Sequence, residues 1–442
     1  MSAPAARDGL ARATARDDGR RVLLAGGGSG GHVFPALAVG DELAARGWKV
    51  EFTGAATGME ARLVGERGMP FHPLPALPFV GRGLVDRLRA LATLVRSTFA
   101  ARRLIRGLGI AVVVGTGGYV SAPAVLGAAL AGRPSLLLEP NAVPGTANRW
   151  LSRWASDAAV AFDACAGRLH CGGAVTGVPV RAEFAALPDE PARREPPGSE
   201  TPGSEALRLL VAGGSQGAEQ LNRLVPAALG TLAAAGRLPA LSVLHQAGRG
   251  KVEPTAEAYR AAGLAVHDAG GAATTRAHGA AAAGGSAPGT AGRAASGEEV
   301  RGPAGAGRAP DVTVADFVAD MASEVGAAHL VVSRAGAITA AEICNAGRAS
   351  LLVPLTLAGG HQADNARALE EAGAAVVLPS AGLTAEALTA ALGGLLADRG
   401  RLAAMGRAAR AIARPGAAAA IADRVERLAA AGDGATSGRR AA

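Results

Sequence analysis

Aromatic residues and cysteines are scarce in this chain of 442 residues. Aromatic side chains make up only 3% of the sequence, whereas Ala and Gly are abundant, which favours closely packed layers of helix and sheet over an aromatic-rich β-sandwich. The cysteines Cys165, Cys171 and Cys344 lack paired C-x-x-C spacing. Neither a disulfide framework nor a cysteine zinc site is therefore indicated, and a reducing compartment fits this usage.

Long apolar runs are missing as well. No stretch approaches the roughly 20 apolar residues of a membrane-spanning helix, and residues 1–20 mix both charges without the apolar core of a signal peptide. We expect residues 1–20 to be a disordered extension and any membrane contact to be peripheral.

The charge balance is basic, with 45 Lys and Arg against 37 Asp and Glu and a formal net charge of +8. Such a balance favours anionic partners such as phosphates, nucleic acid or acidic lipid. A solvated basic surface explains the charge equally well, so the charge alone does not choose a partner.

Short apolar runs rich in β-forming residues alternate with amphipathic stretches in both halves of the chain, as expected for βαβ units. The predicted strands of the first half are 21–25, 49–53, 110–114, 135–138 and 158–162, and those of the second half are 207–212, 241–245, 312–315, 329–333, 350–353 and 375–378. We therefore predict the α/β class with two Rossmann-like, doubly wound parallel sheets.

Low-complexity segments suggest where the domains end. Residues 187–205, rich in Pro, Gly, Ser and charge, are interpreted as a linker between an N-terminal domain at 21–186 and a C-terminal domain at 206–415. Residues 269–299 contain no Val, Leu, Ile, Met or aromatic residue, so we expect a disordered insertion. The Ala- and Arg-rich end predicts helices, with a last helix and tail at 416–442 that can cross back onto the first domain.

Three glycine-rich turns, within 26–31, 112–123 and 209–222, follow predicted strands and open predicted helices. Glycines let backbone N–H groups approach an anion, and a helix N-terminus adds partial positive charge. With Glu51 ending the next strand, the first turn alone also fits a dinucleotide-binding fingerprint. Three turns on two sheets suit instead two pyrophosphates, one from a donor nucleotide and one from an acceptor. Tight strand-to-helix turns remain the alternative for any single loop.

Eight motifs, in order over about residues 20–380, resemble the MurG family of peripheral UDP-N-acetylglucosamine transferases of peptidoglycan synthesis: GGGSGGHVFPALAV, GTGGYVSAP, EPNAVPGTANRWLS, GVPVR, GGSQGAEQLN, DFVADM, SRAGAITAAE and HQADNARALEEAGAA. The resemblance implies a GT-B fold, with two domains facing a cleft. The N-terminal domain would hold the acceptor and contact the membrane, and the C-terminal domain would hold the UDP-sugar.

The resemblance also implies the reaction. It is the inverting transfer of GlcNAc from UDP-GlcNAc to the 4-hydroxyl of MurNAc in undecaprenyl-pyrophosphoryl-MurNAc-pentapeptide (lipid I), giving lipid II at the cytoplasmic face of the cell membrane. The expected partners are thus UDP-GlcNAc, lipid I and an anionic membrane surface, without nucleic acid.

Carried over by position, the resemblance implies donor contacts from both domains: Ser29, Gly30, Gly31, Asn141, Arg181, Ser215, Val318, Ala337, Ile338, Thr339, Ala340, Ala341, Glu342 and Gln362. Val318 would contact uracil through its backbone. Glu342 stands at a helix start, where a carboxylate can accept both ribose hydroxyls, although a Glu in an Ala-rich helix is more often simply solvated.

Acceptor contacts are expected from His32, Gly117, Gly118 and Tyr119. His32 ends the first glycine turn at a helix N-terminus, which favours the neutral imidazole and makes it the candidate general base. A histidine that caps the helix or orders a phosphate is an equal alternative. His361 is a lesser candidate for sugar or phosphate binding, and His245 is interpreted as structural.

No D-x-D motif and no Asp/His cluster with metal-ligand spacing occurs in the sequence. We therefore expect no metal site and no required cofactor, with helix N-termini, Arg181 and loop amides meeting the leaving-group charge. A loosely bound Mg²⁺ is compatible with this pattern.

A membrane-docking patch is predicted at Leu77, Phe79, Val80 and Leu84, before a segment in which leucines interleave with arginines up to residue 108. Apolar side chains rimmed by arginine suit docking on anionic headgroups. An ordinary sheet-covering helix with a basic face is the alternative, and it accounts for some of these leucines.

The sequence departs from the family pattern at Pro140, where Gln is usual, and at Val178, where Asn is common. Both changes put the local geometry in question rather than the reaction, because Asn141 and Arg181 remain. Three rival functions stay open at this point: another GT-B glycosyltransferase with a lipid or small-molecule acceptor, a UDP-GlcNAc 2-epimerase and an NAD-dependent oxidoreductase.

Overall fold

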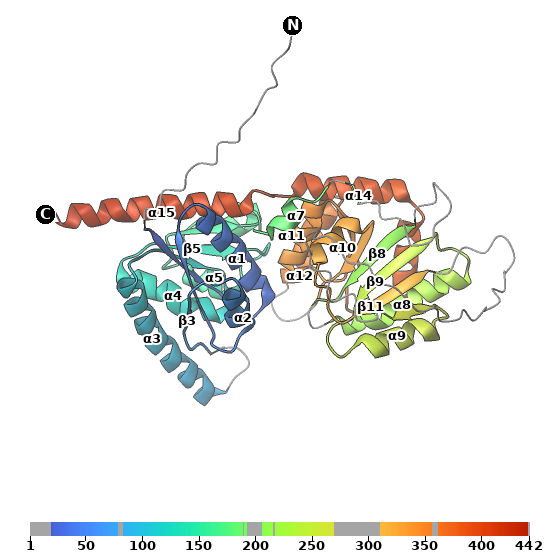
Figure 1. Cartoon of the computed structure of the whole chain (residues 1–442), viewed down its shortest axis with the longest axis horizontal. Coiled ribbons are helices and arrows are strands. Elements are labelled where there is room, and N and C mark those ends of the chain that lie inside the picture. The colour runs from blue at the N-terminus through green and yellow to red at the C-terminus, as the bar shows by residue number, and fades with distance from the viewer. Residues whose placement is uncertain are drawn as a thin grey trace, which may run out of the picture. The chain divides into compact units, whose positions relative to one another are not determined.

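The computed structural model describes residues 19–77, 83–188, 190–191, 206–214, 217–268, 310–355 and 361–440, without the side chains of Leu84 and of residues 433–440. The predicted insertion at 269–299, most of the predicted linker and most of the N-terminal extension lie outside the described residues. The chain divides into two units, one formed by residues 1–185 and 414–442 and the other by residues 186–413 (Figure 1).

The first unit is built on a seven-stranded parallel sheet with the order β3-β2-β1-β4-β5-β6-β7. Its strands are β1 (Arg21–Ala25), β2 (Lys49–Gly54), β3 (Phe71–Pro73), β4 (Ile110–Gly115), β5 (Ser135–Glu139), β6 (Asp157–Val160) and β7 (Ala174–Val175). Its helices are α1 (Gly30–Ala45), α2 (Met59–Glu66), α3 (Leu84–Gly107), α4 (Gly118–Ala131), α5 (Thr146–Leu151), α6 (Asp163–Ala166), α7 (Ala182–Ala185) and α15 (Ala417–Arg440). The strand order reverses between β1 and β4, so loops diverge at their carboxyl ends and leave a place for ligands.

The last helix belongs to the core of the first unit. Buried apolar side chains of α15, including Ile421 and Val425, join those of α1 on one face of the sheet. Arg46, at the end of α1, forms ion pairs with Asp423 at 2.6 Å and Glu426 at 3.1 Å. Because residues 414–442 follow the whole second unit in sequence, the first unit is completed only by the end of the chain.

The second unit has its own seven-stranded parallel sheet with the order β10-β11-β9-β8-β12-β13-β14. Its strands are β8 (Leu207–Ala212), β9 (Leu241–Gln246), β10 (Val266–Asp268), β11 (Asp311–Ala315), β12 (Leu330–Ser333), β13 (Ala349–Leu352) and β14 (Ala375–Val377). Its helices are α8 (Glu219–Ala234), α9 (Val252–Ala261), α10 (Met321–Ala327), α11 (Ala337–Ala346), α12 (His361–Glu371), α13 (Ala385–Leu396) and α14 (Arg399–Ile412). Here the order reverses at β8, which lies between β9 and β12.

The predicted α/β class and the two doubly wound parallel sheets of the GT-B fold are confirmed. All eleven predicted strands are present within two residues of their expected ends. The strands that the sequence pattern missed are β3, β7 and β10, which have only two or three residues and lie at sheet edges. The expectation that Glu51 ends its strand is wrong, because β2 continues to Gly54. None of the described helices is long and apolar enough to cross a membrane.

Candidate active site

The first glycine turn, between β1 and α1, is shaped by side chains of the protein itself. A Cβ atom on Gly26 would lie 2.0 Å from the hydroxyl oxygen of Thr116, and one on Gly27 would lie 2.2 Å from a carboxylate oxygen of Glu60. Gly28 has φ +80°, which favours glycine. At these positions glycine is therefore required by the fold itself, before any ligand is considered.

The end of this turn presents the N-terminus of α1. Ser29 is the N-cap residue with extended backbone, and its carbonyl accepts hydrogen bonds from the N–H groups of His32 and Val33. The N–H groups of the first helical turn, including those of Gly30 and Gly31, have no partner within the helix. This end of α1 can therefore receive an anionic oxygen of a ligand.

His32 is held by the second glycine turn. Its Nδ1 lies 2.7 Å from the carbonyl oxygen of Thr116. A carbonyl only accepts, so Nδ1 carries the proton and Nε2 keeps its lone pair. Gly117 and Gly118 leave room for the ring, because Cβ atoms there would lie 3.1 and 3.3 Å from it. Burial lowers the pKa of His32 below 6.5, partly offset by the Thr116 bond and by Glu139, so the imidazole is neutral at pH 7.

Glu139, at the carboxyl end of β5, organises the loop that carries Asn141. One carboxylate oxygen accepts from the backbone N–H and side-chain amide of Asn141 at 3.1 and 2.9 Å, and the other accepts from the N–H of Gly145 and the amide of Asn148, both at 2.9 Å. Sequence analysis did not single out this residue. Its place within the EPN motif was the available signal.

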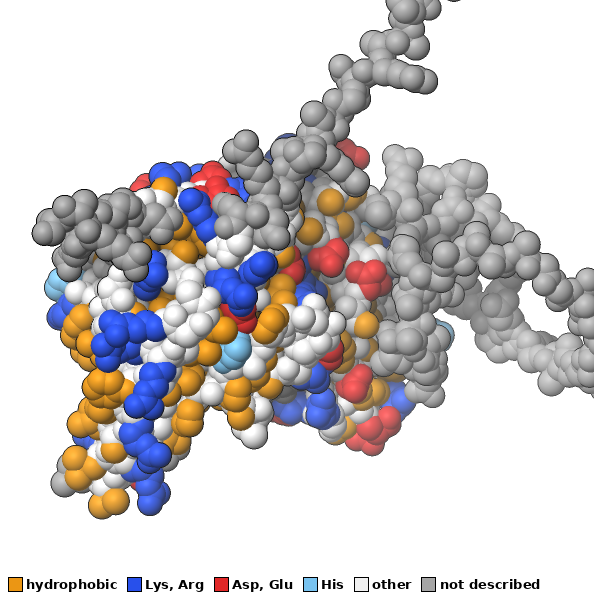
Figure 2. Space-filling view, turned by 60° about the vertical axis from the view of Figure 1, so that its left-hand side comes forward, with side chains coloured by type: hydrophobic (Ala, Val, Ile, Leu, Met, Phe, Trp, Pro, Cys, Tyr) orange, Lys and Arg blue, Asp and Glu red, His pale blue; other side chains and the backbone are white. Residues whose placement is uncertain are grey.

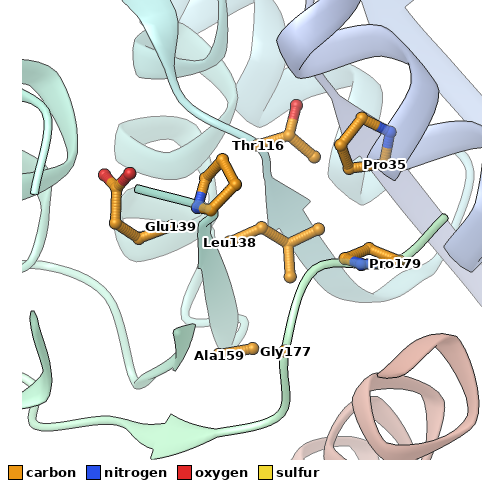
Figure 3. A pocket seen from close by; sticks show the side chains of 8 residues that line it. Pro35, Thr116, Leu138, Glu139, Ala159, Gly177 and Pro179 are labelled. Carbon is orange, nitrogen blue, oxygen red and sulfur yellow. The ribbon is translucent and has the colours of Figure 1, made fainter. Parts of the chain in front are cut away.

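Pro140, one of the two departures from the family pattern, lines a small cavity together with Thr116, Leu138 and Pro179 (Figure 3). The cavity measures about 10 Å³, close to the smallest volume that holds one water. With Pro140 at this position, the bonds of Glu139 to Asn141 are still present.

Arg181 lies between two aromatic rings. Its guanidinium carbon is 5.5 Å from the ring centre of Phe34 on α1 and 4.7 Å from that of Phe184 on α7. These cation–π contacts hold the side chain beside the first turn of α1, since Phe34 also packs against Gly30. Tyr119, on α4, is 38% exposed.

In the second unit, the candidate donor residues gather at the carboxyl edge of the sheet. Helix α11 starts with Ala337 directly after its N-cap Gly336, and Ile338, Thr339, Ala340 and Ala341 form its first turns. Glu342 is only 8% exposed, so the alternative that it is simply a solvated surface residue is wrong. Val318, three residues after the end of β11, is 7% exposed, whereas its neighbour Phe317 is 52% exposed.

Arg334, which the sequence analysis missed, follows β12 at the same edge. Its guanidinium donates to the carbonyl oxygen of Val353 at 3.0 Å and to the side-chain oxygen of Gln220 at 3.3 Å. Burial lowers its pKa, which marks a partly desolvated cation next to the start of α11. Gln362 accepts from the N–H of Leu355 at 3.0 Å. Ser215 lies outside the described residues.

His245 is fully buried and structural in its contacts. Its two ring nitrogens lie 2.9 Å from the hydroxyl of Tyr259 and 3.1 Å from the amide oxygen of Asn222. Burial lowers its pKa to about 3. With both nitrogens bound inside the core, this histidine has no access to a substrate.

Glu51 is occupied by side chains of its own unit. Its carboxylate is 2.7 Å from Arg21 and 2.8 Å from His72. A dinucleotide-binding acid must reach a ribose beyond the end of its strand, but Glu51 lies within β2 and is only 4% exposed. These contacts disfavour the oxidoreductase.

The predicted membrane patch is described in part. Leu77 is partly buried, α3 begins at Leu84, and Phe79 and Val80 lie outside the described residues. Along α3, a row of apolar side chains at helical spacing is exposed by 48–73%: Val85, Leu88, Leu91, Val95 and Phe99. These five do not cover the sheet, although Leu94 packs against a core cluster of the unit. Figure 2 shows hydrophobic side chains beside a column of Lys and Arg on this projecting part of the first unit.

Within the part of the chain that the structure describes, no three His, Cys, Asp or Glu side chains come together as metal ligands.

Comparison with known proteins shows the family of the chain. The model of the glycosyltransferase family 28 N-terminal domain matches residues 22–160, and that of the glycosyltransferase family 28 C-terminal domain matches residues 208–269 and 293–425. A UDP-N-acetylglucosamine--N-acetylmuramyl-(pentapeptide) pyrophosphoryl-undecaprenol N-acetylglucosamine transferase of Ectopseudomonas mendocina is 39% identical over 404 residues, which cover 91% of this chain and 97% of the relative.

Among solved structures, MurG of Acinetobacter baumannii is 30% identical, with a TM-score of 0.67 over 92% of this chain and 99% of that one. A putative UDP-N-acetylglucosamine 2-epimerase from Listeria monocytogenes has a TM-score of 0.57 at 13% identity over 91% and 94% of the two chains, so it shares the fold alone. The chain is a glycosyltransferase of family 28 and belongs to the MurG family.

Proposed function

We propose that this chain transfers GlcNAc from UDP-GlcNAc to the 4-hydroxyl of MurNAc in lipid I, with inversion, and so forms lipid II. The observation that carries the chemical step is His32, whose Nδ1–H is bound by the Thr116 carbonyl while Nε2 keeps its lone pair. Nε2 takes the proton of the acceptor hydroxyl as its oxygen forms the new bond to the anomeric carbon. The bond from that carbon to the UDP oxygen breaks on the opposite side.

The donor is held mainly by the second unit in this proposal. The first N–H groups of α11 face the diphosphate, and the buried carboxylate of Glu342 accepts the ribose hydroxyls. Uracil is bound at the backbone of Val318, and Ser215 and Gln362 complete the pocket. Negative charge on the departing UDP is met by the α11 amides and, as a new assignment, by the guanidinium of Arg334.

The first unit supplies the acceptor side and part of the donor pocket. Its α1 N-terminus, from Ser29 to Gly31, together with Asn141 and Arg181, completes the donor contacts. Gly117, Gly118 and Tyr119 line the acceptor pyrophosphate next to His32. Helix N-termini and guanidinium groups supply the positive charge, so we propose that no resident metal is required, while added Mg²⁺ can still stimulate the reaction.

Membrane docking, at the cytoplasmic face, is proposed for the segment from Leu77 to Leu84 and for the exposed row on α3. Ser97 of α3 donates a 2.6 Å hydrogen bond to the carbonyl of Pro75, which ties the chain just before that segment to the helix. Arg87, Arg89 and Arg96 are exposed on the same helix. Apolar side chains can enter the bilayer boundary while these arginines pair with anionic headgroups.

The deciding experiment incubates the protein with labelled UDP-GlcNAc and a short-chain lipid I analogue and identifies the product by mass. The proposal predicts a product heavier by one N-acetylhexosamine residue, formed together with UDP. Conversion of UDP-GlcNAc without any acceptor would favour the epimerase, and transfer to an unrelated acceptor in preference to the analogue would favour another glycosyltransferase.

A further inference from the structure

A buried acid lies beneath the first glycine turn. Glu60 is in the first turn of α2 and is fully buried. One carboxylate oxygen accepts a hydrogen bond from the N–H of Ala55 at 2.9 Å, and the other accepts from the N–H of Gly28 at 3.3 Å. A single side chain therefore joins the loop after β2 to the turn that leads into α1.

The surrounding backbone is shaped around this carboxylate. A Cβ atom would lie 2.2 Å from a Glu60 oxygen if placed on Gly27 or Gly58, and 2.6 Å from its Cγ if placed on Gly54. Real Cβ contacts are never this short, so all three positions need glycine while Glu60 is present. Glycines from two separate parts of the chain thus leave room for the same Glu60 side chain.

The charge of Glu60 argues against a direct role in anion binding. A carboxylate beneath a turn that receives phosphate oxygens repels them, and it occupies the N–H of Gly28 that could otherwise bind one. A carboxylate can accept a hydrogen bond at each of its two oxygens, and both bonds are needed here to hold the N–H groups of Gly28 and Ala55. A glutamine of the same size would turn its NH₂ group towards the N–H of either Gly28 or Ala55.

We propose that Glu60 is the positioning residue of the first glycine turn. By fixing Gly28, it fixes the next residue, Ser29, whose carbonyl receives the N–H groups of His32 and Val33 and so sets the first turn of α1. Glu60 thereby determines where the amides of Gly30 and Gly31 point and where the His32 ring lies. This role rests on the proposed function for its effect on catalysis.

The first test compares Glu60→Gln with Glu66→Gln. Glu66 is on the same helix but is exposed and pairs only with Arg62 among the contacts described. We expect Glu60→Gln to lower kcat roughly 10- to 100-fold, because misplacement of a base by about 1 Å has effects of this size. The KM for UDP-GlcNAc should rise as well, because Gly30 and Gly31 are proposed donor contacts. Hydrogen exchange of the amides at 26–31 should accelerate about tenfold or more. Glu66→Gln should leave all three as in the parent.

A second test keeps the proposal open to refutation if Glu60→Gln folds poorly. Gly27→Ala should disturb exchange in the same turn, whereas Gly65→Ala, where a Cβ meets nothing within 4 Å, should not. In a Glu60→Ala background, which removes the clashing carboxylate, adding Gly27→Ala should cause little further change. Independent, additive effects of Gly27→Ala and Glu60→Ala would overturn the proposal, as would parental exchange and kcat in Glu60→Gln.

The experiments distinguish a failure of the proposed function from a failure of the proposed role of Glu60. If the parent protein transfers no GlcNAc, the proposed function is wrong, but the exchange and coupling measurements still decide whether Glu60 holds the turn. If the parent transfers GlcNAc and Glu60→Gln does so equally fast, only the role of Glu60 is wrong.

Discussion

The two units use their glycine turns differently. In the first unit, glycines at 26, 27, 117 and 118 make room for side chains, namely Thr116, Glu60 and His32. In the second unit, a Cβ on Gly217 would lie 1.8 Å from the carbonyl oxygen of Ala247, so that turn packs on backbone, while Gly336 at the start of α11 has nothing nearer than 3.9 Å. Glycine content alone therefore does not mark a ligand site, because several of these glycines are required by packing within the protein.

The largest expected effect concerns the histidine that the first-unit glycines surround. His32→Ala should lower kcat by about 10²–10⁴-fold with little change in donor affinity, the usual range for loss of a general base. Burial lowers the pKa of His32 below 6.5, so the parent rate should fall only as the pH drops through that lowered value. A variant that keeps the parental kcat and the same acidic limb would exclude His32 as the base.

The second prediction compares the loss of stability caused by alanine at Gly217 and at Gly336. Gly217 has φ +71° and no room for a Cβ, so Gly217→Ala should destabilise the second unit by roughly 2–5 kcal/mol through backbone strain and overpacking. Gly336→Ala has space and an extended backbone, and should cost less than about 1 kcal/mol. Urea unfolding of both variants checks the difference, and equal losses would contradict the contrast between packed and open turns.

The third prediction concerns His245, the buried histidine in the core of the second unit. His245 has a folded pKa of about 3, below its unfolded value near 6.5, so the unfolded state binds a proton first as the pH falls. Its contribution destabilises the fold between those two values, by at most about 1.4 kcal/mol per pH unit. His245→Asn should show a shallower loss of stability than the parent between pH 6.5 and 4, measured by urea unfolding. Parallel pH profiles would show that His245 is not kept neutral.

The smallest effect on the fold is expected from the exposed face of α3. Replacing Leu88 and Phe99 with Ser should leave the melting temperature and the turnover of a short-chain acceptor unchanged, because both side chains are largely exposed. Sedimentation with anionic vesicles should fall strongly. Ile412→Ser, at an exposed apolar position of the second unit, is the matched control. Vesicle binding equal to that of the parent would remove α3 from the docking surface.

The sequence predicted the central strands because several of them, such as β1, β4 and β12, are apolar runs buried on both faces of a parallel sheet. It missed β3, β7 and β10, whose few residues at a sheet edge carry little pattern. The motifs contain Glu139 and Arg334 as well as His32 and Glu342, but of these the sequence analysis assigned roles only to His32 and Glu342, and Glu60 lies outside every motif. The partners of Glu60, Gly28 and Ala55, lie in two separate loops, and the sequence of an acid in the first turn of a helix looks the same whether the side chain is buried or solvated.

The central claim is that the second unit mainly holds the nucleotide, whereas the first unit supplies the base His32. It is tested most directly by calorimetric titration of UDP into the parent, Glu342→Ala and His32→Ala. If the second unit holds the nucleotide, Glu342→Ala should weaken UDP binding by roughly 1.5–3 kcal/mol, the range for a lost charge-assisted hydrogen bond. His32→Ala should bind UDP as the parent does. Unchanged affinity in Glu342→Ala, together with weakened binding in His32→Ala, would place the nucleotide on the first unit and contradict the account.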